Sequence, residues 1–138
     1  MQYIYTLIIF LSTITYSFSQ NETSAVSPES TDSVYVTVER MPEFPGGIPK
    51  IGEFLQNNLR YPKAAFKANI TGKVFGTFIV GEDGTIRDIE ITQGIGYGCD
   101  EEVIRVIKLM PKWIPGMQGG KTVAVRYVLP INFSIGKK

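Results

Sequence analysis

The chain has 138 residues, with 14 lysines and arginines against 13 aspartates and glutamates, so its formal net charge is only +1. This balance offers no basic surface for nucleic acid or for an anionic membrane. The sequence contains no histidine and one cysteine, Cys99, which excludes an internal disulfide, the usual Ser/His and Cys/His nucleophile pairs and most zinc sites. We therefore expect neither a cofactor nor a nucleic-acid partner.

The first segment is an apolar run over residues 3–18 that ends in Ser17-Phe18-Ser19. The small residues Ser17 and Ser19 fit a signal-peptidase site, which predicts a signal peptide over residues 1–19 and a mature chain that begins at Gln20. An uncleaved signal anchor is the alternative. No Lys or Arg precedes the run, and it is shorter than the ~20 apolar residues that span a bilayer comfortably.

The next segment, residues 20–37, is predicted to be a flexible tether, because its Ser, Thr, Glu, Asp and Asn residues bury too little apolar surface to order it. At its end Val34, Val36 and Val38 alternate with other residues, which indicates a short strand or an extended arm. We expect one folded domain over residues 38–138, since a mature chain of this length supports a single core.

Two short helices are predicted next. Residues 41–47 contain two prolines and two glycines, which forbid regular structure. Pro49 then fits the first turn of a helix with apolar residues along one side. Those residues are Ile51, Phe54, Leu55 and Leu59. Tyr61-Pro62 ends this helix, and Pro62 suits the start of a second one over residues 63–68.

A β-hairpin follows over residues 73–92. Its first strand, residues 73–80, is apolar on both faces, which predicts a central position in a sheet. Asp83-Gly84 supplies the positive φ of a tight reversal, and residues 85–92 return as the second strand. In that strand Ile89 and Ile91 are expected to face the core, while Asp88 and Glu90 face water.

A glycine-rich loop at residues 94–98 leads into the next predicted helix. A phosphate-binding role for this loop has little support, because no P-loop lysine or ribose carboxylate accompanies it. Asp100 is expected to cap the helix, with Glu101 and Glu102 at its positive end. The apolar stripe of the helix is expected to consist of Val103, Val106, Ile107 and Met110.

The last element is a long strand over residues 121–135. It follows a break at residues 111–116, in which Trp113 is expected to be a core anchor. Its side chains alternate between two faces. Pro130 lacks an N–H donor and is therefore tolerated mainly at the edge of a sheet. The pattern predicts that the final strand lies at the rim, with an open edge that can accept a strand from another protein.

An enzyme is the remaining alternative from the residues themselves. Glu43, Asp83, Asp88 and Asp100 could supply paired carboxylates for acid–base chemistry. They fall in a turn, a hairpin, a solvent-facing strand position and a helix start, so no catalytic residues are assigned.

The order and spacing of several short motifs resemble the C-terminal domain of TonB in its Bacteroidetes form. The resemblance spans residues 38–135 and includes a Pro-Glu-Phe-Pro-Gly-Gly element at residues 42–47. The positions that carry the family motif are Tyr61, Pro62, Asp83, Gly84, Trp113, Pro115 and Gly116. The resemblance implies an α+β fold: a two-layer domain with a three-stranded antiparallel β-sheet packed against helices.

The same resemblance implies a partner and a binding edge. In the family the final strand receives the TonB box, an N-terminal segment of an outer-membrane TonB-dependent receptor, by strand addition. Carried onto this chain, the recipient positions are Val123, Ala124, Val125, Arg126, Tyr127, Val128 and Leu129. A periplasmic location then follows for the exported chain.

An energy transducer of this family also has a membrane helix that engages ExbB and ExbD, and a long linker rich in proline. The segment before the expected domain is short and lacks that composition. A short inner-membrane transducer coupled to ExbB and ExbD is therefore kept as the alternative function. A homodimer formed by pairing of two sheet edges is a further expectation.

Overall fold

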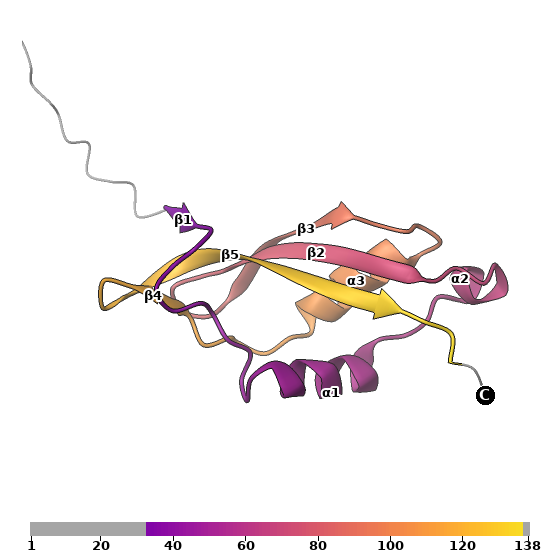
Figure 1. Ribbon diagram of the computed structural model, residues 1–138, viewed down its shortest axis with the longest axis horizontal. Helices are drawn as coiled ribbons and strands as arrows, with labels where there is room; N and C mark the ends of the chain where they lie inside the picture. Colours follow the sequence, from indigo (N-terminus) through magenta and orange to yellow (C-terminus); the bar gives the residue numbers. More distant parts are fainter. Residues whose placement is uncertain (1–32, 137–138) are drawn as a thin grey trace, which may run out of the picture.

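The computed structural model describes residues 33–136 (Figure 1). The elements in chain order are β1 (Val34–Tyr35), α1 (Ile48–Asn58), α2 (Lys63–Lys67), β2 (Gly72–Val80), β3 (Ile86–Gln93), α3 (Cys99–Lys108), β4 (Gly116–Gln118) and β5 (Lys121–Phe133). The expected signal peptide and most of the expected tether lie outside the described residues. Within residues 33–136, no helix is long and apolar enough to cross a membrane.

The sheet has the strand order β1-β5-β2-β3, and β4 pairs with the start of β5. The α+β architecture is confirmed, with helices packed against a sheet whose three long strands are antiparallel, while the short β1 pairs with β5 in parallel. The strand count is corrected, because the short strands β1 and β4 join the three long ones and make a five-stranded sheet. The alternation of Val34, Val36 and Val38 predicted a short strand or an extended arm at the end of the tether, and β1 lies there. No strand was predicted at residues 116–118.

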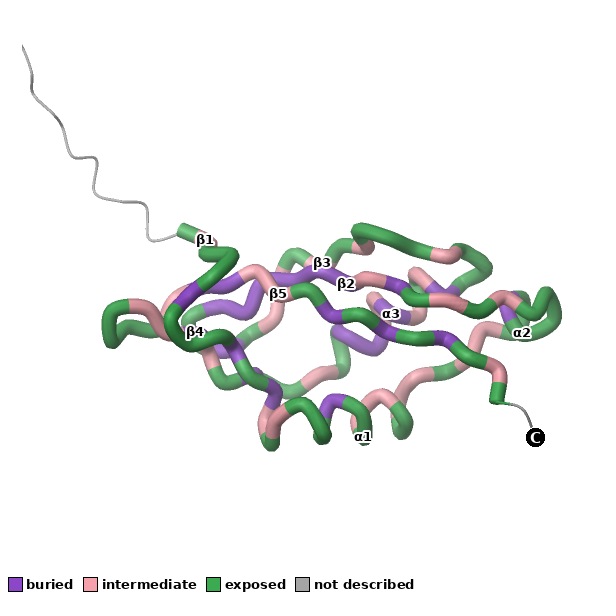
Figure 2. Tube along the Cα trace, in the orientation of Figure 1, coloured by how far each residue is buried: buried purple, intermediate pink, exposed green. Residues whose placement is uncertain are grey.

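The core of the sheet is the antiparallel ladder between β2 and β5. Its register is unbroken from Gly72 opposite Phe133 to Val80 opposite Val125. One face of this ladder is buried along its length, as the purple segments of both strands show (Figure 2). The buried side chains on that face are Val74, Phe78, Val80, Val125, Leu129, Ile131 and Phe133. The central position predicted for β2 is confirmed, because β5 and β3 flank it.

Helix α3 covers the buried face at Gly76. A Cβ at Gly76 would lie 2.8 Å from Cδ1 of Ile107 and 3.2 Å from Cγ1 of Val103, so glycine allows the helix to approach the strand closely. The predicted apolar stripe of this helix is confirmed, since Val103, Val106 and Ile107 are fully buried and Met110 packs partly buried beside them.

The start of α3 differs from the prediction. The helix begins at Cys99 with Gly98 as its N-cap, so Asp100 lies inside the first turn. The Asp100 carboxylate accepts hydrogen bonds from the backbone N–H of Ile95 at 3.0 Å and of Gly96 at 3.3 Å. Asp100 therefore folds the glycine-rich loop back onto the helix, and these two amides are not available to a phosphate.

An extended arm, residues 38–44, links β1 to α1. Arg40 and Met117 exchange two backbone hydrogen bonds, and Glu43 and Ile114 exchange two more. The arm thus runs antiparallel to the segment around β4. It buries Val38, Pro42 and Phe44, which fixes the point at which α1 begins.

The far end of α1 is tied to α3 through Glu102 and Arg105. The Glu102 carboxylate accepts two hydrogen bonds of 2.8 Å, one from the backbone N–H of Arg60 and one from the side-chain Nε of Arg105. Arg105 also donates to the backbone carbonyl of Asn58 at 2.7 Å. The hydrogen bond from Arg105, followed by that from Arg60, lowers the pKa of Glu102.

We predict that Gly84→Ala destabilises the hairpin strongly. Gly84 has a φ of +84°, and a Cβ there would overlap the carbonyl oxygen of Trp113. Gly96 also has a positive φ, of +70°, but a Cβ there meets nothing within 4 Å. Gly96→Ala should therefore cost only the ~1–2 kcal/mol of left-handed backbone strain. Urea unfolding that gives equal losses for the two variants would contradict the close packing of Gly84 on Trp113.

We predict that Glu102→Gln lowers the free energy of unfolding at neutral pH by about 1 kcal/mol, a figure reduced for screening because Arg105 is partly exposed. The folded-state pKa of Glu102 lies below the ordinary value of a glutamate carboxyl, so its contribution to stability is complete above that ordinary value. It is lost as pH falls through the lowered pKa. Urea unfolding of both proteins between pH 7 and pH 3 checks this. A difference that grows on acidification would contradict it.

Candidate functional site: the free edge of β5

Strand β5 has strand partners on both sides only near its start. Val123 pairs with Gly116 of β4, Ala124 pairs with Val34, and Val125 lies between Tyr35 and Val80. From residue 126 to residue 133, β2 occupies one side, and no strand among residues 33–136 occupies the other. The recipient positions predicted at residues 123–129 therefore overlap this free edge at residues 126–129 only, because β4 pairs with Val123 and β1 pairs with Ala124 and Val125. Binding at this edge stays a prediction.

The outward-facing backbone groups can be identified from Pro130. It lies opposite Phe75, whose carbonyl accepts a hydrogen bond from Thr92 Oγ1 of β3 at 3.2 Å. The Phe75 peptide groups therefore face β3, and Pro130 correspondingly faces away from β2. Backbone groups alternate along a strand, so the N–H groups of Arg126, Val128 and Asn132 also point outward. Only Pro130 lacks a donor on this side, and its position matches the predicted preference of proline for an edge.

The two outer edges of the sheet differ in how they are protected. The edge of β3 carries an Arg87–Asp88 ion pair of 3.1 Å, and Asp88 has a φ of +52° that kinks the strand. Charges and kinks of this kind discourage pairing with another chain. Beyond Arg126, the exposed edge of β5 carries no charged side chain up to Phe133. The edge of β5 is therefore the better acceptor for an added strand.

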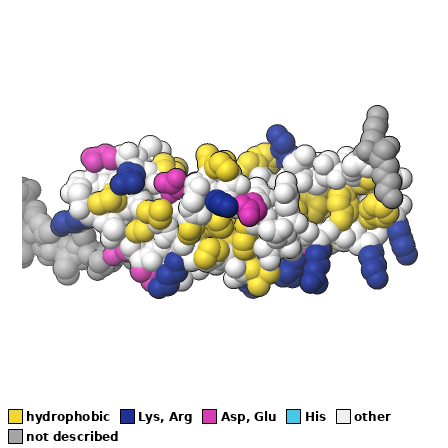
Figure 3. Space-filling view, turned by 90° about the horizontal axis from the view of Figure 1, so that it is seen from below, with side chains coloured by type: hydrophobic (Ala, Val, Ile, Leu, Met, Phe, Trp, Pro, Cys, Tyr) yellow, Lys and Arg dark blue, Asp and Glu magenta, His cyan; other side chains and the backbone are white. Residues whose placement is uncertain are grey.

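A groove lies beside this edge, between β5 and α1. It consists of two adjoining hollows of about 380 and 360 Å³. The first hollow is lined by Met41, Pro42, Glu43, Phe44, Ile48, Ile51 and Tyr127, and the second by Ile48, Ile51, Gly52, Leu55, Tyr127, Leu129 and Pro130. Glu43 is the one charged residue among them. Viewed from the α1 side, hydrophobic side chains are exposed along the middle of this face, with charged groups both among them and around them (Figure 3).

An aromatic cluster lies under the groove. The ring of Trp113 packs against Tyr127 at a centroid distance of 4.8 Å, Phe78 at 5.3 Å and Phe44 at 5.7 Å. The core position predicted for Trp113 is confirmed, since it is 3% exposed. Its Nε1 has no hydrogen-bond partner in the described part of the chain. Tyr127 and Phe44 belong to both the cluster and the groove, so the tryptophan lies one layer below the groove surface.

The residues of the family motif support the edge and do not line it. The hydroxyl of Tyr61 donates to the carbonyl of Ile70, and its ring packs on Phe133 at 5.6 Å, where β5 ends. Burial raises the pKa of Tyr61. Pro62 lies at the start of α2.

The other motif residues meet near the start of β5. The backbone N–H of Trp113 donates to the backbone carbonyl of Gly84 at 2.9 Å. The Asp83 carboxylate accepts from the N–H and the hydroxyl of Thr85, which lowers the pKa of Asp83. Pro115 precedes Gly116, and a Cβ at Gly116 would lie 2.6 Å from Cγ2 of Val125. Sequence reasoning found these positions but could not separate structural motif residues from contact residues.

The structure does not bring together the carboxylates considered for an enzyme. Glu43 lies in the arm, Asp83 in the hairpin turn, Asp88 on β3 and Asp100 in α3. Residues 33–136 hold no group of three or more side chains that could bind a metal ion. Cys99 is buried, and desolvation raises the pKa of its thiol, which favours the protonated, unreactive form.

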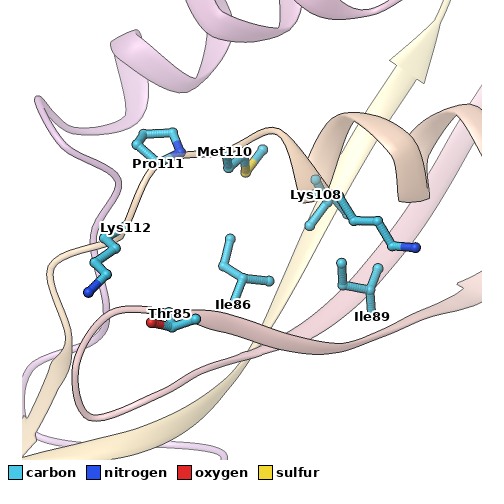
Figure 4. Close-up of a pocket in the computed structure, with 8 residues that line it drawn as sticks. Thr85, Ile86, Ile89, Lys108, Met110, Pro111 and Lys112 are labelled. Carbon is cyan, nitrogen blue, oxygen red and sulfur yellow. The ribbon is translucent and has the colours of Figure 1, made fainter.

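A separate hollow of about 200 Å³ lies between β3 and the end of α3. Figure 4 shows apolar side chains, among them Ile86 and Met110, inside it. The ammonium groups of Lys108 and Lys112 lie at opposite ends and extend in different directions. They do not converge on one point, so the hollow has no arrangement suited to an anion.

Comparisons with known proteins found a matching family model and similar solved structures. The family model for the Gram-negative bacterial TonB protein C-terminal matches residues 57–135. The solution structure of residues 194–285 of the Helicobacter pylori TonB C-terminal domain is 25% identical, with 65% of this chain and 95% of that chain covered and a TM-score of 0.47. That of the Pseudomonas aeruginosa TonB C-terminal domain is 29% identical, with 57% and 80% covered and a TM-score of 0.45. No curated protein matches the chain.

The family match covers more than half of the chain, and it includes β2, β3, α3, β4, β5 and the supporting motif residues. Strand β1, the arm and nearly all of α1 lie before it. The chain belongs to the family of Gram-negative bacterial TonB protein C-terminal domains.

Proposed function

We propose that this domain binds the TonB box of an outer-membrane TonB-dependent receptor by adding it as a strand to β5. The observation that carries the proposal is the edge at residues 126–133, which has no strand partner on its outer side within residues 33–136 and no charged side chain beyond Arg126. TonB C-terminal domains are a non-enzymatic, transport-related family of the cell envelope and interact with outer-membrane receptors as a class. In this proposal the domain works in the periplasm, after export by the signal peptide, and supports energy-dependent transport across the outer membrane.

The backbone groups at the edge set the expected strength of binding. The outward N–H groups of Val128 and Asn132, together with the outward carbonyls of Arg126, Val128, Pro130 and Asn132, offer about six hydrogen bonds, each with a net contribution of ~0.5–1.5 kcal/mol. The N–H of Arg126 also points outward, but the parallel pairing of Tyr35 with Val125 engages it. Ordering the incoming segment offsets part of this gain. The expected dissociation constant is therefore about micromolar to millimolar, which suits a contact that forms and releases during transport.

A second candidate is a short transducer that remains anchored in the inner membrane and couples to ExbB and ExbD. The observation that favours it is the apolar run at residues 3–18, which lies outside the described residues. N-terminal sequencing of the protein from its host distinguishes the two. A mature chain that begins at Gln20 favours the exported domain, whereas Met1 in the membrane fraction favours the anchored transducer.

We predict that Val128→Pro weakens receptor binding by about two- to tenfold, because it removes one outward donor worth ~0.5–1.5 kcal/mol. Val128 is 52% exposed, and its N–H faces away from β2, so the β2–β5 ladder loses no hydrogen bond. The measurement is a titration of each protein with a synthetic peptide of a receptor N-terminal segment. Amide chemical shifts in nuclear magnetic resonance (NMR) report the binding.

Val128→Thr is the matched control, since threonine keeps the donor and suits a strand. In the wild-type protein and in this control, shifts should concentrate at residues 126–133. Unchanged affinity of Val128→Pro, or shifts confined to the edge of β3, would contradict strand addition to β5.

A further inference from the structure

Helix α1 is held by contacts near both ends, but its middle buries little side-chain surface against the rest of the domain. Near its start, Phe44 packs against Phe54 and Trp113 at centroid distances of 5.7 Å each. At its end, Arg105 holds the carbonyl of Asn58. Between these anchors Ile51 is the one buried residue of the helix. The helix lies beside the open side of β5 (Figure 1), and the two hollows lie between the helix and the strand.

The space left between the helix and the strand is divided into the two hollows. The first lies between the arm, the start of α1 and Tyr127. The second lies between the middle of α1 and residues 129–130. Both are lined by Ile48, Ile51 and Tyr127, so they adjoin one another along the strand.

The register of an added strand fixes which of its side chains enter this space. Residues that face each other across two paired strands point to the same side of the sheet. Tyr127 and Leu129 both border the groove, at positions i and i+2 of β5. The partner residues opposite them must also lie at i and i+2 and point toward α1. Their spacing of about 6.8 Å along the strand suits two adjoining hollows.

We infer that the arm and α1 make the β5 edge selective for an extended polypeptide with large apolar side chains at two alternate positions, one for each hollow. This inference rests on the strand-addition function proposed above. It assigns the selectivity to a segment that precedes residue 57, where the family match begins. The occupant is a partner protein's extended segment, since a second copy of β5 would bring Tyr127 and Leu129 side chains already packed into their own core.

Gly52 provides a substitution that fills the second hollow and leaves the fold intact. A Cβ at Gly52 would meet nothing within 4 Å, and the residue lines the second hollow from the exposed side of α1. Gly52→Leu places a large side chain in this space and raises helix propensity. Gly52→Ala controls for helix propensity, and Gln56→Leu controls for an added leucine at an exposed position of α1 that lines neither hollow.

The probes are two seven-residue peptides of serine and threonine that contain two leucines each. In one peptide the leucines occupy the third and fifth positions, and in the other the third and fourth. Trp113 is the one tryptophan of the chain and packs on Tyr127, so its fluorescence reports on the groove. Amide shifts of β5 report separately on strand addition.

We expect the alternating peptide to bind the wild-type protein about tenfold more tightly than the adjacent-leucine peptide, equivalent to about 1.4 kcal/mol. Gly52→Leu should bind the two peptides within about twofold, whereas Gly52→Ala and Gln56→Leu should keep the tenfold preference. Equal affinities for the wild-type protein, with β5 amides still shifted, would overturn this inference and leave strand addition standing.

Two further outcomes would also overturn the inference. An absence of β5 shifts with both peptides would count against strand addition as well. Concentration-dependent broadening of the β5 amides without peptide would show that a second copy fills the groove.

Discussion

The antiparallel ladder between β2 and β5 decides what the rest of the molecule can do. It runs without interruption from Val80 to Gly72 on one strand and from Val125 to Phe133 on the other, and its inner face is the core of the domain. Because one side of β5 is committed to this ladder, its other side is fixed as the remaining edge. Pro130 fits at this edge because its missing donor faces outward.

The segment before the family-matched region changes the character of that edge. Strand β1 occupies the side of β5 near Val125, the arm pairs with the segment around β4, and α1 lies beside the rest of β5 with two hollows between them. Backbone pairing alone would accept almost any extended segment. The apolar walls that α1 supplies add the side-chain contacts on which selectivity depends.

The sequence predicted the long elements well, because each carries a strong local signal. The apolar stripe of α3, the Asp83-Gly84 reversal and the two-faced apolar pattern of β2 all led to the observed positions. The sequence did not reveal that β1 and β4 cover residues 123–125. Both strands are held by pairing with distant residues. The alternating valines indicated a strand near residue 34 but not its partner, and the three residues of β4 carry no periodicity of their own. Asp100 was misassigned as a cap because its partners lie in the preceding loop, at a spacing that no local rule describes.

Amide hydrogen exchange along β5, measured by NMR in the free protein, tests most directly whether this edge is available. The N–H groups of Tyr127, Leu129 and Ile131 face β2 and should exchange slowly, whereas those of Val128 and Asn132 should exchange rapidly. Addition of a receptor N-terminal segment should then slow the second set. Equal protection of both sets in the free protein would show that the outer side of β5 is already occupied, and it would contradict the account.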